Sequence, residues 1–364
     1  MRNRIFIIGG HFTPAKAIYE KLKDNKSLDI YFVGIKHTML FDKSLSSEYK
    51  FAKENNIKFI SVNTGKLYRF FSLKGILSLI LIPIGFIQSF IYLIKYKPKL
   101  LIGFGSYIDV PIILTGNLLN IKSIIHTQAS IPGLATRLTA KKAQKICVSF
   151  EDSRQYFDRK KTLFTGNILR KEIFTNNSND FYFKYNLPII YITGGNQGSH
   201  FINQLIFDCL DTLLESYNII HQTGSNTIYN DYRKSIELKD KLSNLKKQRY
   251  ISKEGIWNNQ IGEVFSKASL IISRAGANSV SEILYLSKRA ILIPIKNSSY
   301  NEQENNAYIA KKLGRVTVLD QDKVTKEHLI EEIRVILNLP EKKYTLETLD
   351  ASSLMYNEIM KLLN

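Results

Sequence analysis

Two neighbouring stretches decide the fold: Ile271-Ile-Ser-Arg-Ala-Gly-Ala-Asn-Ser-Val-Ser-Glu-Ile283 and Asn301-Glu-Gln-Glu-Asn-Asn-Ala307. An apolar run from Ala268 to Ile272 predicts a buried parallel strand. The small residues from Ser273 to Ser279 then let the backbone turn into a helix that carries Glu282. A strand, a small-residue loop and a helix in this order direct unpaired backbone N–H groups at an anion, most often a phosphate.

The polar residues around this unit suggest what else the anion carries. Glu282 supplies a carboxylate that can accept hydrogen bonds from paired hydroxyls, such as those of a ribose. Gln303 follows a second predicted strand, Ala290 to Pro294, and its amide suits a neutral polar ligand. Each piece alone has an ordinary alternative, a plain turn or a solvated Glu. Together, the partners for phosphate, diol and amide predict a nucleotide-sugar site.

The rest of the chain repeats the alternation of strands and helices; for example, it predicts strands over Ile189–Thr193 and Asn218–Gln222 with one helix, Phe201–Leu214, between them. At 364 residues it is long for one core, and an Asn- and Ser-rich stretch from Lys171 to Phe183 predicts a boundary between two domains. We therefore expect residues 1–170 and 171–364 to form two Rossmann-like domains of class α/β, with the last helix able to pack back on the first. Their parallel sheets would face one another across a cleft, with ligands at the carboxyl ends of the strands. Cys147 and Cys209 lie in apolar runs without metal-like spacing, which indicates buried thiols of a cytoplasmic protein, and no signal peptide is recognisable.

Positive charge is concentrated in the first domain. The net charge is +19, and residues 1–170 hold 27 Lys and Arg against 10 Asp and Glu, which gives +17 and leaves 24 against 22, or +2, for the remainder. This asymmetry implies an anionic partner for the first half, either nucleic acid or a membrane surface. We find no helix-turn-helix, zinc-finger or RNA-binding motif, so we expect no nucleic-acid partner.

An uncharged apolar stretch from Leu77 to Ile94 favours the membrane. It approaches the length of a bilayer span, but Pro83 and Gly85 weaken that reading, and a crossing would split one domain. A helix that packs in the domain and dips its surplus apolar face into lipid headgroups fits better, although a wholly buried core helix is the alternative. Basic residues flank the stretch and would attract an anionic leaflet, so we expect residues 66–99 to contact it. They are Lys66, Arg69, Lys74, Lys95, Lys97 and Lys99.

Loops at the ends of the other predicted strands carry further candidate residues. Gly9-Gly10 allows close backbone approach, and His11 is either a general base or a capping residue. Arg170, at the predicted domain junction, could reach a diphosphate, or it could be a solvated linker residue. The remaining loops are Gly103-Phe-Gly105-Ser106-Tyr107, His126-Thr-Gln128, Thr165-Gly-Asn167 and Gly194-Gly195-Asn196-Gln197-Gly198-Ser199. We expect His126, at the end of a predicted strand from Ser123, and Gln128 to stand on the same rim of the cleft as His11.

Taken in order along almost the full chain, these loops resemble the MurG family of glycosyltransferases, glycosyltransferase family 28. The resemblance includes His126-x-Gln128, Gly194-Gly-x-Gln197-Gly198, Ser273-Arg-x-Gly276-Ala277 with Ser281-Glu282, and Gln303 with Asn306-Ala307. It implies a GT-B fold and an inverting transfer of N-acetylglucosamine from UDP-GlcNAc to a lipid-linked acceptor, lipid I. It also implies a peripheral position at the cytoplasmic face of the plasma membrane.

The resemblance assigns roles residue by residue. His11 would be the catalytic base, Glu282 would hold the ribose, Gln303 the sugar, and Arg170 with residues 196–199 the uridine diphosphate. The donor set it implies is Arg170, Gly195, Asn196, Gln197, Gly198, Ser199, Gly276, Ala277, Glu282, Gln303 and Asn306. The acceptor-side set is Gly9, Gly10, Gly105, Ser106, Tyr107, His126 and Gln128.

The chain departs from the family pattern mainly on the acceptor side. The first loop is shorter and poorer in glycine than the family's, and Thr127-Gln128-Ala129 replaces the usual Glu-x-Asn after the histidine. Alternatives to lipid I transfer are a UDP-sugar transferase with another lipid acceptor, a UDP-GlcNAc 2-epimerase, and a non-catalytic nucleotide-sugar sensor at the membrane. None of the loops quoted above contains an Asp-x-Asp pair, so we expect neither a catalytic metal nor a cofactor.

Overall fold

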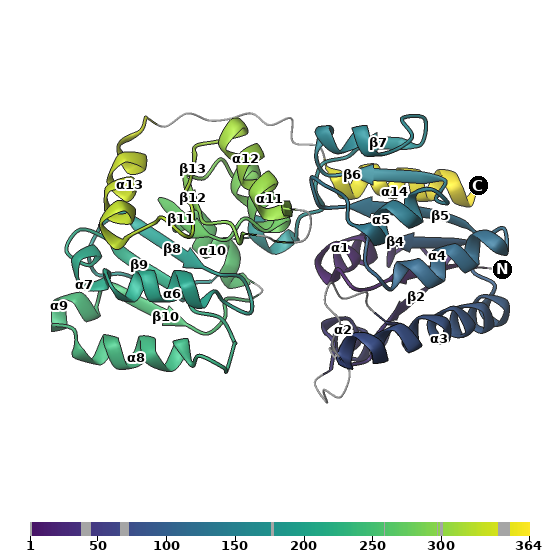
Figure 1. Ribbon diagram of the computed structural model, residues 1–364, viewed down its shortest axis with the longest axis horizontal. Coiled ribbons are helices and arrows are strands. Elements are labelled where there is room, and N and C mark those ends of the chain that lie inside the picture. Colours follow the sequence, from purple (N-terminus) through teal and green to yellow (C-terminus); the bar gives the residue numbers. More distant parts are fainter. Residues whose placement is uncertain are drawn as a thin grey trace. The chain divides into compact units, whose positions relative to one another are not determined.

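The computed structural model describes residues 2–37, 45–65, 73–175, 178–257, 259–296, 298, 301–340 and 350–364, the side chains of 73–77 excepted. The chain divides into two compact units, Met1–Arg170 with Leu349–Asn364, and Lys171–Thr348 (Figure 1). Each unit is an α/β layer structure around one parallel sheet, so the predicted class is confirmed.

Unit 1 is built on a parallel sheet with the strand order β3-β2-β1-β4-β5-β6-β7. Its strands are rich in Ile, Val and Phe and are buried on both faces, which is why they read as continuous apolar runs rather than alternating ones. The strands are β1 (Asn3–Ile8), β2 (Leu28–Gly34), β3 (Lys58–Ser61), β4 (Leu100–Gly103), β5 (Lys122–Thr127), β6 (Lys145–Val148) and β7 (Thr162–Phe164).

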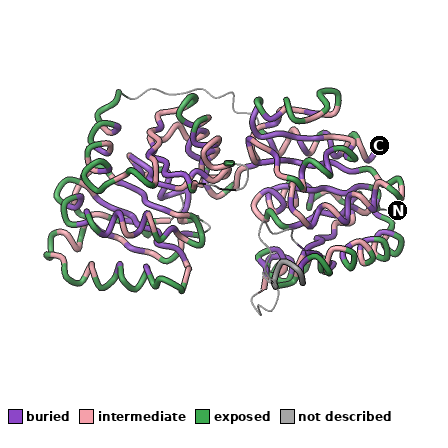
Figure 2. Tube along the Cα trace, viewed as in Figure 1, coloured by how far each residue is buried: buried purple, intermediate pink, exposed green. Residues whose placement is uncertain are grey.

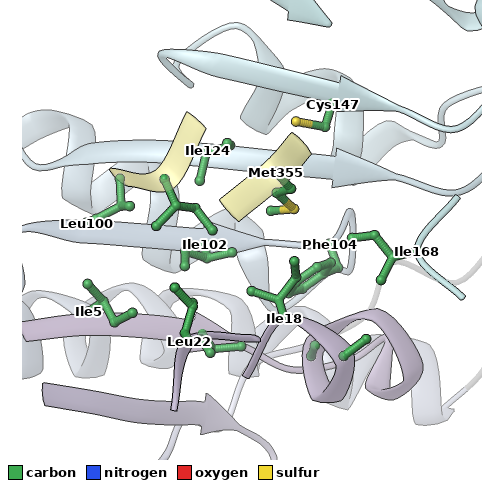
Figure 3. Close-up of a cluster of buried hydrophobic side chains, with 14 of the residues drawn as sticks. Ile5, Ile18, Leu22, Leu100, Ile102, Phe104, Ile124, Cys147, Ile168 and Met355 are labelled. Carbon is green, nitrogen blue, oxygen red and sulfur yellow. The ribbon is translucent and has the colours of Figure 1, made fainter. Parts of the chain in front are cut away.

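Alternate residues of β1 point to the two faces of this sheet. Ile5 and Ile7 join the core beneath helices α1 (Phe12–Leu22), α2 (Ser47–Glu54) and α14 (Ala351–Leu363). Phe6 and Ile8 join the opposite core, beneath α3 (Leu73–Tyr96), α4 (Asp109–Leu118) and α5 (Leu134–Ala140). The last helix of the chain therefore completes unit 1, and Figure 3 shows its fully buried Met355 among residues of α1, β4 and β5.

Helix α3 has the reverse of the usual amphipathic pattern. Apart from the buried Leu93, its inner face has small or polar residues, with Ser78 and Ser89 buried and Gly85 packed against Thr64. Its outer face is a stripe of large apolar side chains, exposed by 38% at Ile84 and by 60% at Ile87 (Figure 2). The stripe consists of Leu79, Ile80, Ile84, Ile87, Phe90, Ile91 and Ile94. The alternative of a wholly buried core helix is therefore wrong. The flanking Lys66 and Arg69 lie outside the described residues.

Unit 2 repeats the plan with the strand order β10-β9-β8-β11-β12-β13. Its strands are β8 (Ile189–Thr193), β9 (Asn218–Gln222), β10 (Tyr250–Lys253), β11 (Leu270–Ser273), β12 (Ala290–Leu292) and β13 (Val316–Val318). Its helices are α6 (His200–Phe207), α7 (Leu210–Leu213), α8 (Asp231–Lys241), α9 (Asn244–Lys247), α10 (Asn259–Lys267), α11 (Ala277–Tyr285), α12 (Glu302–Leu313) and α13 (Lys326–Asn338). The sequence predicted one helix over Phe201–Leu214; the chain instead breaks at Cys209, which begins α7 with non-helical angles.

The strand order places one topological switch point in each sheet. In unit 1, β1 pairs with both β2 and β4, so the loops after β1 and β4 lie side by side. In unit 2, β8 pairs with both β9 and β11, which brings together the loops after β8 and β11. Ligands of open α/β sheets bind at such points because the loops diverge there and leave a crevice.

Candidate functional site

A cavity of about 530 Å³ opens at the switch point of unit 2. This volume lies within the range of small-molecule sites in proteins. Its wall combines the loop after β8, the loop after β11 and the start of α12. The lining residues are Gly194, Gly195, Gly198, Ser199, His200, Phe201, Tyr229, Arg274, Gly276, Ser279, Ile295, Gln303 and Gln321.

The loop after β8 has a backbone that only glycine allows at two points. Gly195 and Gly198 have φ of +82° and +80°, in the left-handed region that side chains disfavour. A side chain at Gly198 would also clash with the carbonyl oxygen of Thr223, at the end of β9. Ser199 then caps α6 by accepting a hydrogen bond from the Ile202 N–H at 3.4 Å. The loop therefore turns tightly and opens a helix, as an anion-binding loop requires.

Gly276 has no such backbone reason to be glycine. It is the N-cap of α11 with φ −66° and ψ 146°, angles that any residue adopts. A methyl group built on it would meet no protein atom within 4 Å. Neither strain nor packing explains this glycine, and it lines the cavity, so the space beside it is available to a ligand.

Arg274 lines the same cavity and was not singled out as a site residue from the sequence. Its Nε donates to Ser199 Oγ at 2.9 Å, and its Nη1 donates to the carbonyl oxygen of Ile293 at 2.9 Å. Burial lowers the pKa of this guanidinium to about 10, and among the described residues no carboxylate forms an ion pair with it. A partly buried cation held by neutral partners lacks its counter-charge, which an anionic ligand would supply. The sequence feature that could have identified Arg274 is its position as the one charged residue in the loop of small residues from Ser273 to Ser279.

The other predicted donor residues divide into those in the cavity wall and those behind it. Gln303 lines the cavity, and its Oε1 accepts from the Ile295 N–H at 3.0 Å. Asn306 is fully buried behind the wall, where its Nδ2 donates to the carbonyl oxygen of Ala275 at 3.2 Å and ties α12 to the loop after β11. Glu282 is also buried, on α11, and is not part of the wall. Three further predicted residues also lie outside the wall: Asn196 and Gln197, which are exposed, and Ala277, which begins α11.

In unit 1 the predicted acceptor loops are fastened together at the switch point. Ser106 Oγ donates to the carbonyl oxygen of Gly9 at 2.9 Å, and the Gly10 N–H donates to Glu48 Oε1 at 2.8 Å. Asp109 accepts from the N–H groups of Gly105 and Ser106 at 2.6 and 3.1 Å, and burial raises its pKa to about 7. These bonds fix the peptide unit between Gly9 and Gly10, directly before His11, and the loop after β4 that lies beside it.

His11 occupies the N-cap position of α1 and is exposed there. Its ring makes no capping hydrogen bond to the helix. The capping alternative is therefore wrong. Half-buried Tyr107 sits in the neighbouring loop, where it packs against the core beneath α3 and α4.

The expected place of His126 and Gln128 on an open rim is wrong. His126 lies within β5, paired with Cys147 of β6, and is fully buried. Its Nε2 lies 3.1 Å from the carbonyl oxygen of Gly166, and burial lowers its pKa to about 4, so the ring is neutral at physiological pH. Gln128 is 9% exposed, and its Nε2 has no hydrogen-bond partner among the described residues. Arg170 is the last residue of this part of unit 1, and its donor-binding role stays a prediction.

Comparison with known proteins decides the family. Residues 8–148 match the glycosyltransferase family 28 N-terminal domain, and residues 189–359 match the glycosyltransferase family 28 C-terminal domain. The chain belongs to glycosyltransferase family 28. The family resemblance seen in the sequence is thus confirmed.

Two relatives show how far the family likeness extends. Both are UDP-N-acetylglucosamine--N-acetylmuramyl-(pentapeptide) pyrophosphoryl-undecaprenol N-acetylglucosamine transferases. The one from Borreliella afzelii is 33% identical over 345 residues, which cover 93% of this chain and 88% of the relative. The one from Treponema denticola is 32% identical over 340 residues, which cover 90% and 85%.

Solved structures show the same fold. MurG from Acinetobacter baumannii superposes with a TM-score of 0.69 at 20% identity, covering 99% of this chain and 100% of that one. UDP-GlcNAc 2-epimerase from Methanocaldococcus jannaschii superposes with a TM-score of 0.65 at 15% identity, covering 99% and 100%. The expected GT-B fold class is confirmed, and because a transferase and an epimerase share it, the fold alone does not separate the two reactions.

Proposed function

We propose that this chain transfers N-acetylglucosamine from UDP-GlcNAc to lipid I, the undecaprenyl-diphosphate-linked N-acetylmuramyl-pentapeptide. The family and the activity named for its relatives support this reaction over epimerisation. In the structure, the supporting observation is the cavity of unit 2, where Arg274 lies partly buried without a carboxylate partner among the described residues. A nucleoside diphosphate supplies the missing negative charge.

The diphosphate would lie against the loop after β8. Backbone N–H groups at the start of α6 and the guanidinium of Arg274 converge on this part of the cavity. Such donors are fixed before the reaction, so they stabilise the charge that develops on the departing UDP without having to reorganise. Gln303 in the cavity wall would hold the sugar. Glu282 is buried outside the wall, so the ribose role that the family resemblance gives it stays a prediction.

Attack would come from a hydroxyl of the acceptor sugar. This oxygen forms the new bond to the anomeric carbon as the bond to the UDP oxygen breaks, so the configuration inverts. His11 would accept the hydroxyl proton, as an imidazole can at cytoplasmic pH. Ser106 and Glu48 hold the backbone of the loop that carries it. We expect His11→Ala to lower turnover about 10²- to 10⁴-fold, and near-normal turnover would exclude this role.

The donor half of the proposal is tested by binding of UDP. Arg274→Gln removes charge-assisted hydrogen bonds worth roughly 1.5–3 kcal/mol, so UDP affinity should fall about 10- to 150-fold. Arg233→Gln is the matched control, because Arg233 is 82% exposed on α8 and pairs with Glu237 outside the cavity. Equal UDP affinity in the Arg274 variant and the control would remove the diphosphate from this site.

We also propose that the outer face of α3 rests on the membrane that presents the acceptor. Only 22% of Ser78–Tyr96 is buried, and the window has a mean hydropathy of 1.8. The exposed stripe that includes Ile87 and Ile91 continues into the exposed cations Lys95, Lys97 and Lys99. An apolar face with a basic end is the pattern of helices that lie in the headgroup region of an anionic bilayer.

Sedimentation with vesicles containing an anionic lipid tests this contact. Ile87 and Ile91 are each more than half exposed, so inserting each side chain contributes about 1 kcal/mol. The double change Ile87→Ser and Ile91→Ser should then weaken vesicle binding about 10- to 30-fold. Val335→Ser is the control, since Val335 is 46% exposed on α13 of unit 2. Unchanged vesicle binding in the double variant would exclude α3 as the contact.

A further inference from the structure

His200, Tyr229 and Asp231 form a cluster at the edge of the unit 2 cavity that neither the sequence motifs nor the proposed reaction has used. His200 is the first residue of α6 and lines the cavity together with Tyr229. Their rings are stacked, with centroids 3.9 Å apart and planes inclined by 11°. His200 Nδ1 lies 2.9 and 3.1 Å from the two carboxylate oxygens of Asp231.

Asp231 is itself held firmly. It is 5% exposed and accepts hydrogen bonds from Asn203 Nδ2 at 2.8 Å and from Gln204 Nε2 at 3.2 Å. An ionised carboxylate only accepts, so the Nδ1 of His200 carries a proton. The stacked ring of Tyr229 on one side and the carboxylate at one edge fix the orientation of the imidazole before any ligand arrives.

The other nitrogen of the ring is left for a ligand. Nε2 of His200 has no hydrogen-bond partner among the residues that the structure describes, although the side chain is only 40% exposed. The same cavity wall holds Gly198, Ser199 and Arg274, the residues expected at the diphosphate. A phosphate oxygen only accepts, so a hydrogen bond to it requires a proton on Nε2 as well.

We infer that His200 is a further diphosphate-binding residue, which donates from Nε2 to the nucleotide while Asp231 and Tyr229 position its ring. This inference rests on the proposed function. With Asp231 at one edge and phosphate at the other, the ring is an imidazolium in the complex. Binding of the diphosphate therefore takes up a proton wherever the ring of the free protein carries a proton on Nδ1 alone.

Three other charged or titratable groups bear on this protonation. Asp231, at the start of α8, favours the imidazolium. Lys234, also on α8, opposes it, but its Nζ is bonded to Gln204 Oε1. Arg274, after β11, opposes it until the phosphate arrives and favours phosphate binding at the same time. The negative charge of the diphosphate therefore stabilises both cations, His200 and Arg274, and offsets the repulsion between them.

Calorimetric titration of the full chain with UDP, UMP and uridine tests the inference. His200→Phe keeps an aromatic ring for the stack and removes both nitrogens. We expect UDP affinity to fall about 10- to 100-fold, as for loss of a charge-assisted hydrogen bond, with a smaller loss for UMP and none for uridine. His200→Gln restores one donor and should recover part of the UDP affinity. His328→Phe is the matched control, because His328 is a half-exposed histidine that faces Glu332 on α13.

Proton counting gives a second readout. UDP titrations at pH 8 in two buffers of different ionisation enthalpy should show proton uptake by the wild-type protein and none by either His200 variant. If the wild-type protein fails to bind UDP, the proposed function fails. If it binds UDP and the His200 variants bind it equally well, or lose uridine affinity to the same extent as UDP affinity, the inference is wrong and His200 only shapes the wall.

Discussion

Gly276→Ala is the sharpest single test of how the cavity of unit 2 is used. The change adds one methyl group at a residue whose φ of −66° suits alanine as well as glycine. No protein atom lies within 4 Å of that methyl group. The free protein should therefore accept the substitution, whereas a nucleotide that occupies the space beside Gly276 should not.

The two effects have separate magnitudes. Replacing glycine by alanine at permitted angles stabilises a protein by about 0.4–1 kcal/mol through the unfolded state. Alanine is a poorer N-cap than glycine by a similar amount, so the free energy of unfolding should change by less than about 1 kcal/mol. A methyl group forced against a bound ligand typically costs about 1–3 kcal/mol, which lowers UDP-GlcNAc affinity about 5- to 150-fold.

Gly133→Ala is a closely matched control. Gly133 is the N-cap of α5 in unit 1, with φ −69° and ψ 171°, and a methyl group there would also meet nothing within 4 Å. The two variants should unfold alike. Only Gly276→Ala should lose affinity for UDP-GlcNAc in a calorimetric titration.

Either of two results would show that a bound nucleotide does not explain Gly276. If Gly276→Ala binds UDP-GlcNAc as tightly as the Gly133 variant does, no ligand approaches Gly276. If Gly276→Ala unfolds much more readily than the Gly133 variant, the glycine has a structural role and the loss of binding says nothing about the ligand.

Three further predictions concern the stability of unit 1. Gly85→Leu should lower the free energy of unfolding by about 1–3 kcal/mol or more, since even a methyl group on Gly85 clashes with Thr64; a wild-type denaturation midpoint would contradict this packing. Met355→Ala should cost about 2–5 kcal/mol and speed amide exchange in α1, and unchanged exchange would mean that α14 does not complete the core. The pKa of His126, about 4, lies below the ordinary 6.5, so folding favours the neutral ring. This contribution to the free energy of unfolding is complete above pH 6.5, and up to about 3 kcal/mol of it is lost as the pH falls towards 4. His126→Gln should flatten this pH dependence of the unfolding midpoint, and a slope equal to that of the wild-type protein would refute the prediction.

The sheets were the most predictable part of the fold. Strands β8 and β9 have the bounds expected from the sequence, because buried parallel strands are short apolar runs with clear ends. Strand β10 was missed, since Tyr250–Lys253 is a short edge strand with no apolar run, in which the buried Tyr250 and Ser252 alternate with half-buried residues. The packing of α14 on α1 joins residues more than three hundred positions apart, a contact that no local pattern encodes.

The candidate site was predictable as a set of loops, but not as a set of contacts. Small residues after an apolar strand identified the loops that hold Gly198 and Gly276. The pairing of β8 with β11 then brings both loops to the switch point, where they line one cavity. The sequence did not reveal that Arg274 lies partly buried without a carboxylate partner in the described part of the chain, or that Asp231 holds His200. Both depend on tertiary pairing between loops. We expected His126 at the end of its strand, on the rim of the cleft, whereas β5 continues to Thr127 and holds His126 inside the sheet.

The most direct measurement of the central claim is release of UDP from UDP-GlcNAc by the purified protein in anionic vesicles, with and without lipid I. We expect UDP release that depends on lipid I and is lost in the Arg274→Gln variant. Tight binding of UDP-GlcNAc without any lipid-I-dependent release would contradict the account, because the donor site would stand while the reaction proposed for it would not.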